Sequence, residues 1–413
     1  MEITAKQIES LIEKIHTFSL PEDDGGNTRL TLSPEDMAAR KYVMGEMEKI
    51  GLAVSVDAVG NITGRAAGTE PSLPEVWTGS HIDTVVHGGK YDGVAGVVSG
   101  LEALRTIIAE RAPHKRNICL KIYTGEEGSK FSGGCIGSRV IAGHLTKEDL
   151  DALSDGEGHT VGGLLRGNGF PFDQFDAVRK TARDIYASVE LHIEQGGNLE
   201  KAHKVIGIVD GICAPTNMIL HISGEQGHAG GMPMKDRRDA FMAAAEMALA
   251  LEDCALHGTS AYTTGTVGLV EVSPNAENVV PGKVRMSADV RDCEKQSKDL
   301  VVKNFLSKVH AIAEKRHVKA EVFMKRDDTP HLCDPSIQKL IEKAAEKEHV
   351  SYMHTFSGPC HDSLLIAEIA PVGMIFVPSR GGISHSPKEW TSCKDIAKGA
   401  RVLKDVILAL ANQ

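Results

Sequence analysis

The 413-residue sequence lacks the features that mark several large classes of protein. It has no basic stripe: 56 acidic residues outnumber 46 Lys and Arg, and the net charge is -10. Such a chain is a poor partner for a phosphate backbone. Residues 1–18 place Glu and Lys among Ile and Leu, and Thr4 and Gln7 have capping-box spacing, which predicts a helix rather than a signal peptide or membrane span. We therefore expect a cytoplasmic protein with no nucleic-acid or membrane partner.

Closely spaced cysteines are also missing. The eight cysteines contain no CxxC pair and no repeating interval; they are Cys119, Cys135, Cys213, Cys254, Cys293, Cys333, Cys360 and Cys393. Cysteine-ligated zinc sites usually draw their ligands from close pairs, so this class of site is not expected. Scattered cysteines are typical of reduced thiols in the cytosol, and we expect all eight to be free.

The chain is longer than one hydrophobic core usually supports, and it has no internal repeat. Strands alternate with helices through the first two hundred residues, which favours an α/β fold. After Gly211 the predicted order becomes strand-helix-strand-strand-helix-strand, the split βαβ order of a ferredoxin-like module. The sequence thus predicts an α/β domain in two parts, 1–212 and 330–413, interrupted by an inserted α+β domain, 213–329.

Polar side chains follow the predicted strands of the α/β domain. A strand at 76–82 leads into His81 and Asp83, one at 117–123 leads into Glu126 and Glu127, and one at 185–193 contains His192 near its end. In open α/β sheets functional residues gather just past the carboxyl ends of strands. Because strand side chains alternate with a period of two, His81 and Asp83 share a face, where the carboxylate can hold the imidazole or a neighbouring group.

Two further residues complete a ligand set. Asp92 lies in a glycine-rich turn, and His385 lies in a loop after an apolar run at 372–377. Three imidazoles and two carboxylates suit zinc or manganese, and one carboxylate bridging two ions makes a two-metal site. Taken singly, Asp92 also fits a turn-forming role, and Glu126 with Glu127 also fits an exposed acidic turn. A cation would relieve the repulsion within that glutamate pair.

Several runs together resemble a known family. They are GSHIDTVVHGGKYDG, TGEEGSKF with CIGSR, VELHIEQG, GEQGHAGGMPMKDRRDA, NAENVVPG and GISHSPKEW. In this order they resemble the hydantoinase/carbamoylase branch of the M20 metallopeptidase-like family, which includes N-carbamoyl-L-amino-acid hydrolases, allantoate amidohydrolases and β-ureidopropionases. The resemblance extends from about Gly25 to Trp390.

The resemblance implies a catalytic domain with a mixed sheet flanked by helices and two divalent ions, zinc or manganese, with cobalt as a further option. It implies Glu126 as general base, Asp83 as a support for His81, and five metal ligands: His81, Asp92 (bridging), Glu127, His192 and His385. It also implies that the inserted domain serves dimerisation and acts as a lid.

For the substrate the resemblance implies contacts from Gln195, His228, Asn278 and Arg291. His228 and Asn278 would reach in from the partner subunit of a homodimer, and His228 would also stabilise the oxyanion. The planar guanidinium of Arg291 matches a substrate carboxylate bidentately. The other interpretation of Arg291 is a surface residue paired with Asp289 or Asp292.

The implied activity is hydrolysis of the carbamoyl C–N bond of N-carbamoyl-L-amino acids to the L-amino acid, carbon dioxide and ammonia. Allantoate or β-ureidopropionate hydrolysis is the alternative, and an M20 aminoacylase, a peptidase or a non-catalytic metal-binding scaffold fits less well. Pro359-Cys360 and Gly231-Met232 depart from the small residues common in the family, which bears on substrate shape rather than on the metals.

Overall fold

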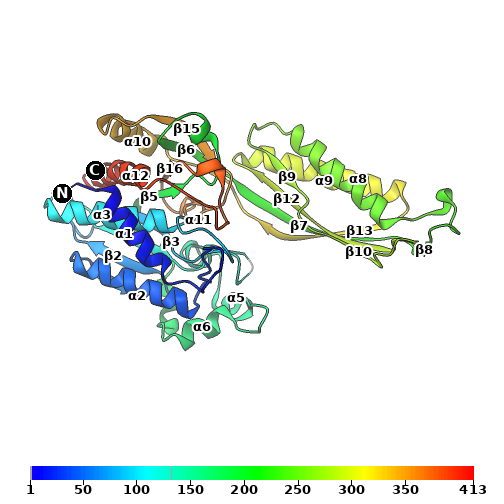
Figure 1. Ribbon diagram of the computed structural model, residues 1–413, viewed down its shortest axis with the longest axis horizontal. Coiled ribbons are helices and arrows are strands. Elements are labelled where there is room, and N and C mark those ends of the chain that lie inside the picture. The colour runs from blue at the N-terminus through cyan, green and yellow to red at the C-terminus, as the bar shows by residue number, and fades with distance from the viewer. Residues whose placement is uncertain (1, 132) are drawn as a thin grey trace. The chain divides into compact units, whose positions relative to one another are not determined.

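A computed structural model describes residues 2–131 and 133–413 and divides the chain into two compact units (Figure 1). The main unit comprises Met1–Asp210, Cys333–Thr355 and His361–Gln413. The inserted unit comprises Gly211–Leu332 and Phe356–Cys360. The short segment 356–360 thus belongs with the insertion, although it lies within the stretch predicted to return to the first domain.

The main unit is built on a mixed sheet with the strand order β1-β2-β4-β3-β5-β16-β6, and β15 also pairs with β6. Its centre is parallel, because β3 pairs in parallel with β4 and β5, and β16 pairs in parallel with β5. The strands are β1 (Ala53–Val56), β2 (Ile62–Ala66), β3 (Glu75–His81), β4 (Ile118–Tyr123), β5 (Ile185–Ile193), β6 (Ile206–Ile212), β15 (Tyr352–Ser357) and β16 (Val372–Val377).

Helices α1, α3 and α12 pack on one another, and α3 and α12 also lie on strands β3 and β5. The helices of the main unit are α1 (Ala5–His16), α2 (Pro34–Lys49), α3 (Val94–Ala109), α4 (Ile136–Ala142), α5 (Lys147–Ala152), α6 (Val161–Gly167), α7 (Asn198–Lys201), α10 (Pro335–Lys347), α11 (Asp362–Ile366) and α12 (Cys393–Ala411). Within the described residues, no helix combines the length and apolar character needed to cross a bilayer.

The helix predicted at the start of the chain is confirmed over Ala5–His16; Met1, where that range began, lies outside the described residues. The capping box forms as its spacing predicts, since Thr4 accepts from the Gln7 backbone while Gln7 accepts from the Thr4 backbone. The predicted strands at 76–82, 117–123 and 185–193 are also confirmed, within a residue at each end. Their carboxyl ends therefore meet at one edge of the sheet.

In the inserted unit the strand order is β10-β12-β7-β13, with β9 also paired to β12. All these pairs are antiparallel, and helices α8 and α9 pack together on the sheet. This is the split βαβ order. The elements are β7 (Ala214–Ser223), β8 (Gly227–His228), α8 (Ala240–Leu256), β9 (Thr264–Thr266), β10 (Val270–Ser273), β11 (Val279–Val280), β12 (Lys283–Asp292), α9 (Lys295–Lys315), β13 (Lys319–Asp327) and β14 (His331–Leu332).

The single strand predicted at 264–272 is in fact two, β9 and β10. Between them the backbone N–H groups of Gly268 and Leu269 donate to the Ser287 hydroxyl, at 3.2 and 3.0 Å. The hydroxyl of one side chain in β12 thus accepts from two consecutive N–H groups in the segment between the two strands. Alternation of apolar residues alone does not reveal such a break.

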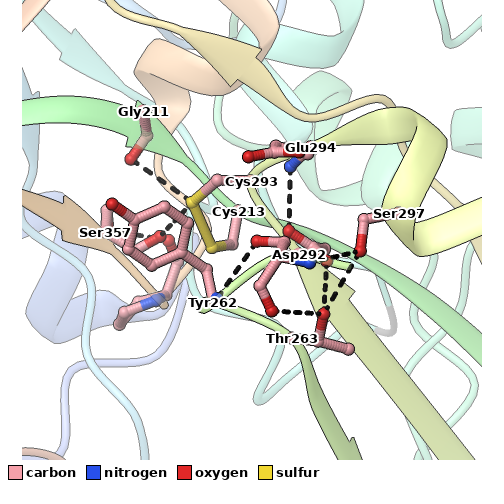
Figure 2. The surroundings of a disulfide bond; sticks show 11 residues. Gly211, Cys213, Tyr262, Thr263, Asp292, Cys293, Glu294, Ser297 and Ser357 are labelled. Atoms are coloured by element: carbon pink, nitrogen blue, oxygen red, sulfur yellow. Dashed lines mark hydrogen bonds between the residues drawn. A yellow bond between two sulfur atoms is a disulfide. The ribbon is translucent and has the colours of Figure 1, made fainter. Parts of the chain in front are cut away.

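The expectation that all eight cysteines are free is wrong for Cys213 and Cys293, which form a disulfide (Figure 2). Strands β7 and β12 pair with Ala214 opposite Asp292, so Cys213, just before β7, and Cys293, just after β12, face each other. They are 80 residues apart in sequence, and their spacing gave no sign of this pairing. Among the described residues, the other six cysteines take part in no disulfide.

Candidate metal centre

The five predicted metal ligands all belong to the main unit, and the fold brings them together. His81 ends β3, Asp92 precedes α3, Glu127 follows β4, His192 lies in β5, and His385 follows β16. Because β4, β3, β5 and β16 are neighbours in parallel, these positions share one edge of the sheet. Segments far apart in the sequence therefore converge on one site.

Asp92 lies at the centre of the cluster. Its Oδ1 faces two imidazoles, at 3.2 Å from His192 Nε2 and 3.6 Å from His81 Nε2. Its Oδ2 lies 3.2 Å from His385 Nε2, which is itself 3.3 Å from Glu127 Oε1. The carboxylate thus divides the candidate ligands into two groups of three that share Asp92, one on each oxygen: His81, Asp92 and His192, and Asp92, Glu127 and His385.

The spacing of these atoms fits metal binding. Ligand atoms around a tetrahedral zinc ion, at bonds of about 2.0–2.1 Å, lie roughly 3.3 Å from one another. Nδ1 of His81 lies 3.0 Å from the Asp83 carbonyl oxygen, and Nδ1 of His192 lies 3.0 Å from the Ile193 carbonyl oxygen. Each carbonyl accepts a hydrogen bond from Nδ1–H, so that in the neutral imidazole the Nε2 lone pair faces the centre of the cluster.

Backbone conformation at Gly93 allows this approach. Gly93 has φ +65°, and a Cβ there would lie 2.5 Å from His81 Cε1, which is closer than real contacts allow. A side chain at this position would therefore push the His81 ring away from Asp92. The glycine that follows Asp92 is required by the packing of an imidazole.

The charged groups of the cluster shift one another's pKa values. Burial raises the pKa of Asp92, but hydrogen bonds from His192, His385 and His81 outweigh it and hold that pKa well below its usual range. Hydrogen bonds to Asp92 and Glu127 raise the pKa of His385 to about 11. Protons on the imidazoles thus compensate the buried carboxylates in the absence of a cation, and a divalent cation would take their place.

The two adjacent glutamates have different partners. Glu127 is buried and faces His385, whereas Glu126 Oε2 lies 3.8 Å from His81 Nε2. The other Glu126 oxygen, Oε1, lies 3.6 Å from Cys135 Sγ. Of the pair, Glu127 is therefore placed to ligate a metal, while Glu126 stands beside the ligand cluster.

Asp83 contacts His81 through its backbone more closely than through its carboxylate, whose Oδ1 lies 3.8 Å from His81 Nδ1. Its Oδ2 accepts from the Thr31 hydroxyl at 2.7 Å and from the Glu127 backbone N–H at 3.2 Å. The Asp83 carboxylate thus holds the backbone of Glu127, a candidate ligand in the loop that follows β4. Thr31 was not singled out from the sequence.

Gln195 also contacts the cluster. Its side-chain amide donates to Asp92 Oδ2 at 2.7 Å, and its backbone N–H donates to the Ser379 hydroxyl at 3.1 Å. The side-chain Oε1 is buried without a hydrogen-bond partner among the described residues. In this structure Gln195 therefore supports Asp92, and its carbonyl oxygen is left to accept from a ligand.

The other predicted substrate residues lie in the inserted unit. His228 in β8 is opposite Val279 in β11, and Ala229 N–H donates to the Asn278 carbonyl, so His228 and Asn278 are neighbours. Arg291 forms a bidentate ion pair with Asp289, with Nε and Nη2 at 3.0 and 3.1 Å from the carboxylate oxygens. Asp289, one of the two partners considered from the sequence, is the one that the structure selects.

Sequence reasoning assigned no role to Glu389, although the residue lies within a quoted run. It is buried. Its burial, and to a smaller extent the negative charge of Asp92, raise its pKa to about 7. It accepts hydrogen bonds from the backbone of Tyr91 and Asp92. The adjacent glycines Gly88 and Gly89 indicated that another group packs closely against this turn, but they did not indicate that the group is Glu389.

A family model matches most of the chain. The model of Peptidase family M20/M25/M40 matches residues 77–409, which include every proposed metal ligand. The chain belongs to this family. It is a hydrolase, and the metal dependence of the M20 family is consistent with the cluster of possible metal ligands around Asp92.

Curated relatives of this M20 chain are similar over nearly its whole length. A ureidoglycolate hydrolase of Arabidopsis thaliana is 38% identical, covering 100% of this chain and 87% of that protein. An N-carbamoyl-L-amino-acid amidohydrolase of Pseudomonas sp. is 36% identical, covering 96% of this chain and 97% of the relative. The crystal structure of a hydantoinase/carbamoylase family amidase from Burkholderia multivorans has a TM-score of 0.90 at 30% identity, covering 100% of this chain and 99% of that one.

We predict that metal binding to this M20 protein releases protons. With a pKa of about 11, His385 is charged at pH 7 in the metal-free protein, yet only the neutral imidazole can ligate. The apparent metal affinity should therefore rise as the pH is raised and fall as it is lowered. Calorimetric titration of chelator-treated protein with Zn²⁺ in two buffers of different ionisation enthalpy measures the protons released. Identical heats in both buffers would contradict this assignment.

Proposed function

We propose that the chain is a metal-dependent amidohydrolase that cleaves the carbamoyl C–N bond of N-carbamoyl-L-amino acids. The products would be the L-amino acid, carbon dioxide and ammonia. The observation that carries this proposal is the placement of Asp92 between two groups of candidate ligands, with Glu126 beside them. Two divalent ions, zinc or manganese with cobalt as a further option, fit the donor set.

When bound, the cations would acidify a water molecule and polarise the ureido carbonyl. The residues provide the proton transfers. Glu126 is beside the ligands, and we assign it the role of taking a proton from the attacking water and returning it to the departing nitrogen. Asp83 holds the Glu127 backbone, and it thereby also fixes the position of the adjacent Glu126.

The inserted unit would supply recognition of the substrate carboxylate. Asp289 engages Nε and Nη2 of Arg291, which leaves the end of the guanidinium, formed by Nη1 and Nη2, for a second carboxylate. The ion pair between the two residues therefore fits a substrate-binding arginine whose plane is fixed in advance. His228 and Asn278 are exposed neighbours and would contact the substrate as well, with His228 stabilising the oxyanion.

We further propose a homodimer in which His228 and Asn278 complete the site of the partner subunit. One support is the outer face of α8, where Met242, Leu249 and Leu256 are exposed at intervals of seven residues. An apolar stripe of this kind favours burial against another surface. A two-fold axis would make the exchange of residues reciprocal. We retain the cytoplasm as the proposed location.

Ureidoglycolate is a second candidate substrate, because the relative from Arabidopsis is similar over the whole chain. Allantoate is another, since an allantoate amidohydrolase of Bacillus subtilis is 34% identical over 94% of this chain. These compounds and N-carbamoyl amino acids share a ureido group close to a carboxylate. The common site chemistry therefore supports the class of reaction better than any one substrate within it.

Ammonia release from a substrate panel tests the proposal. The panel contains several N-carbamoyl-L-amino acids, their D-enantiomers, ureidoglycolate, allantoate and N-carbamoyl-β-alanine, each with protein loaded with Mn²⁺ or Zn²⁺. We expect the highest kcat/KM for an N-carbamoyl-L-amino acid and loss of activity after chelation. Turnover confined to ureidoglycolate or allantoate would replace the proposed substrate, and turnover of acyl amino acids or peptides alone would exclude the ureido class.

Glu126→Gln should lower kcat by about 10²–10⁴-fold while the metal content stays unchanged, because an amide cannot accept the proton of the water. Metal content per chain is measured by elemental mass spectrometry beside the activity. Glu148→Gln, the same change at an exposed position in α5, serves as the control and should leave both quantities unchanged. Loss of metal in Glu126→Gln would instead make Glu126 a ligand.

The composite site predicts complementation between inactive variants. Homodimers of His228→Ala and of Glu126→Ala should both be nearly inactive. In a mixed dimer, the subunit that lacks only its own His228 keeps Glu126 and receives an intact histidine from its partner. One working site in half of the dimers restores about a quarter of wild-type activity.

The variants are unfolded together, refolded with metal and assayed for ammonia release. Native mass spectrometry establishes that mixed dimers have formed. Activity no greater than the sum of the two parents in the presence of mixed dimers would show that His228 does not act across the subunits.

A further inference from the structure

Glu389 is a buried carboxylate that contacts the backbone of the bridging ligand. The residue is 5% exposed, and it lies in the segment that follows His385. Oε1 accepts hydrogen bonds from the backbone N–H groups of Tyr91 at 2.9 Å and Asp92 at 3.1 Å. Two segments 297 residues apart in the chain are thus joined through one oxygen.

The second oxygen reaches the side chain of the same ligand through a serine. Glu389 Oε2 accepts from the Ser384 hydroxyl at 2.8 Å, and that hydroxyl oxygen lies 3.1 Å from Asp92 Oδ2. Ser384 immediately precedes His385, whose Nε2 faces the same Asp92 oxygen. Glu389 therefore contacts Asp92 through its backbone and, by way of Ser384, holds the segment that carries His385.

The carboxylate occupies a closely fitted place. A Cβ on Gly89 would lie 2.1 Å from Glu389 Oε1 and 2.2 Å from its Cδ, so only glycine leaves room for Glu389. Both oxygens are engaged, and the groups around them are donors on the loop of Asp92 and the loop of His385. Glu389 is not itself one of the five proposed metal ligands.

We propose that Glu389 is a positioning residue that fixes Asp92 against His385, so that the metal centre is formed before the metal binds. This inference rests on the metal site of the proposed function. Partners that orient metal ligands typically contribute about 10–100-fold to metal affinity. Because Glu389 touches no reacting group, its loss should weaken metal retention while leaving the chemistry of the loaded site largely unchanged.

The variants Glu389→Ala and Glu389→Gln test this role. Alanine removes all three hydrogen bonds. Glutamine keeps one acceptor oxygen for Tyr91 and Asp92 but offers Ser384 a donor in place of an acceptor, so it should have an intermediate effect. Glu102→Ala is the matched control, because Glu102 is also a buried glutamate, in α3, and pairs with Arg105 rather than with a ligand.

Each protein is stripped with a chelator, and its Zn²⁺ affinity is measured by competition with a chromogenic chelator, without substrate. We expect about 10–100-fold weaker binding in Glu389→Ala, a smaller loss in Glu389→Gln and a change below about twofold in Glu102→Ala. At saturating metal, kcat of Glu389→Ala should return to within a few-fold of wild type. If the alanine variant does not fold, the glutamine variant alone must show weaker binding and recovery.

Wild-type affinity in a folded Glu389 variant would overturn the proposal, as would activity that stays lost at saturating metal. A wild-type protein that binds Zn²⁺ but turns over no ureido substrate would contradict the proposed substrate class and leave this test intact. A wild-type protein that binds no divalent cation would remove the metal site and this inference together.

Discussion

The buried carboxylate of Asp92, facing three imidazoles, is the interaction around which the main unit is organised. A charged group in this position is costly unless it is paired, and each of its oxygens has partners from different strands. The parallel order of β4, β3, β5 and β16 supplies those partners at one edge. Gly93, Asp83 and Glu389 are then required at their positions by the packing and hydrogen bonds around this cluster.

Much of this arrangement could be predicted from the sequence, because the strands are strongly apolar and their polar ends stand out. His81 and His192 lie at strand ends where the pattern placed them, and the helix cap at Thr4 formed as its spacing predicted. Convergence of five distant segments needed the family resemblance. Periodicity predicts where a strand ends, but it does not predict which strands become neighbours.

What could not be predicted depends on contacts between distant side chains and backbone. Glu389 accepts from N–H groups nearly three hundred residues away, and the Ser287 hydroxyl accepts from the backbone between β9 and β10. The pairing of Cys213 with Cys293 follows from the register of β7 and β12, which local sequence does not encode. The partner of Arg291 was narrowed to two neighbouring carboxylates, and only the geometry of β12 decides between them.

The proposed metal ligands come from both parts of the interrupted main unit. His81, Asp92, Glu127 and His192 precede the insertion, whereas His385 follows it. During synthesis on the ribosome, the first part and the whole insertion emerge before the last ligand exists. A complete site can therefore form only after the last part of the chain has packed against the strands that were synthesised before the insertion. Metal uptake would report completion of the main unit, and its binding energy would hold the late segment in place.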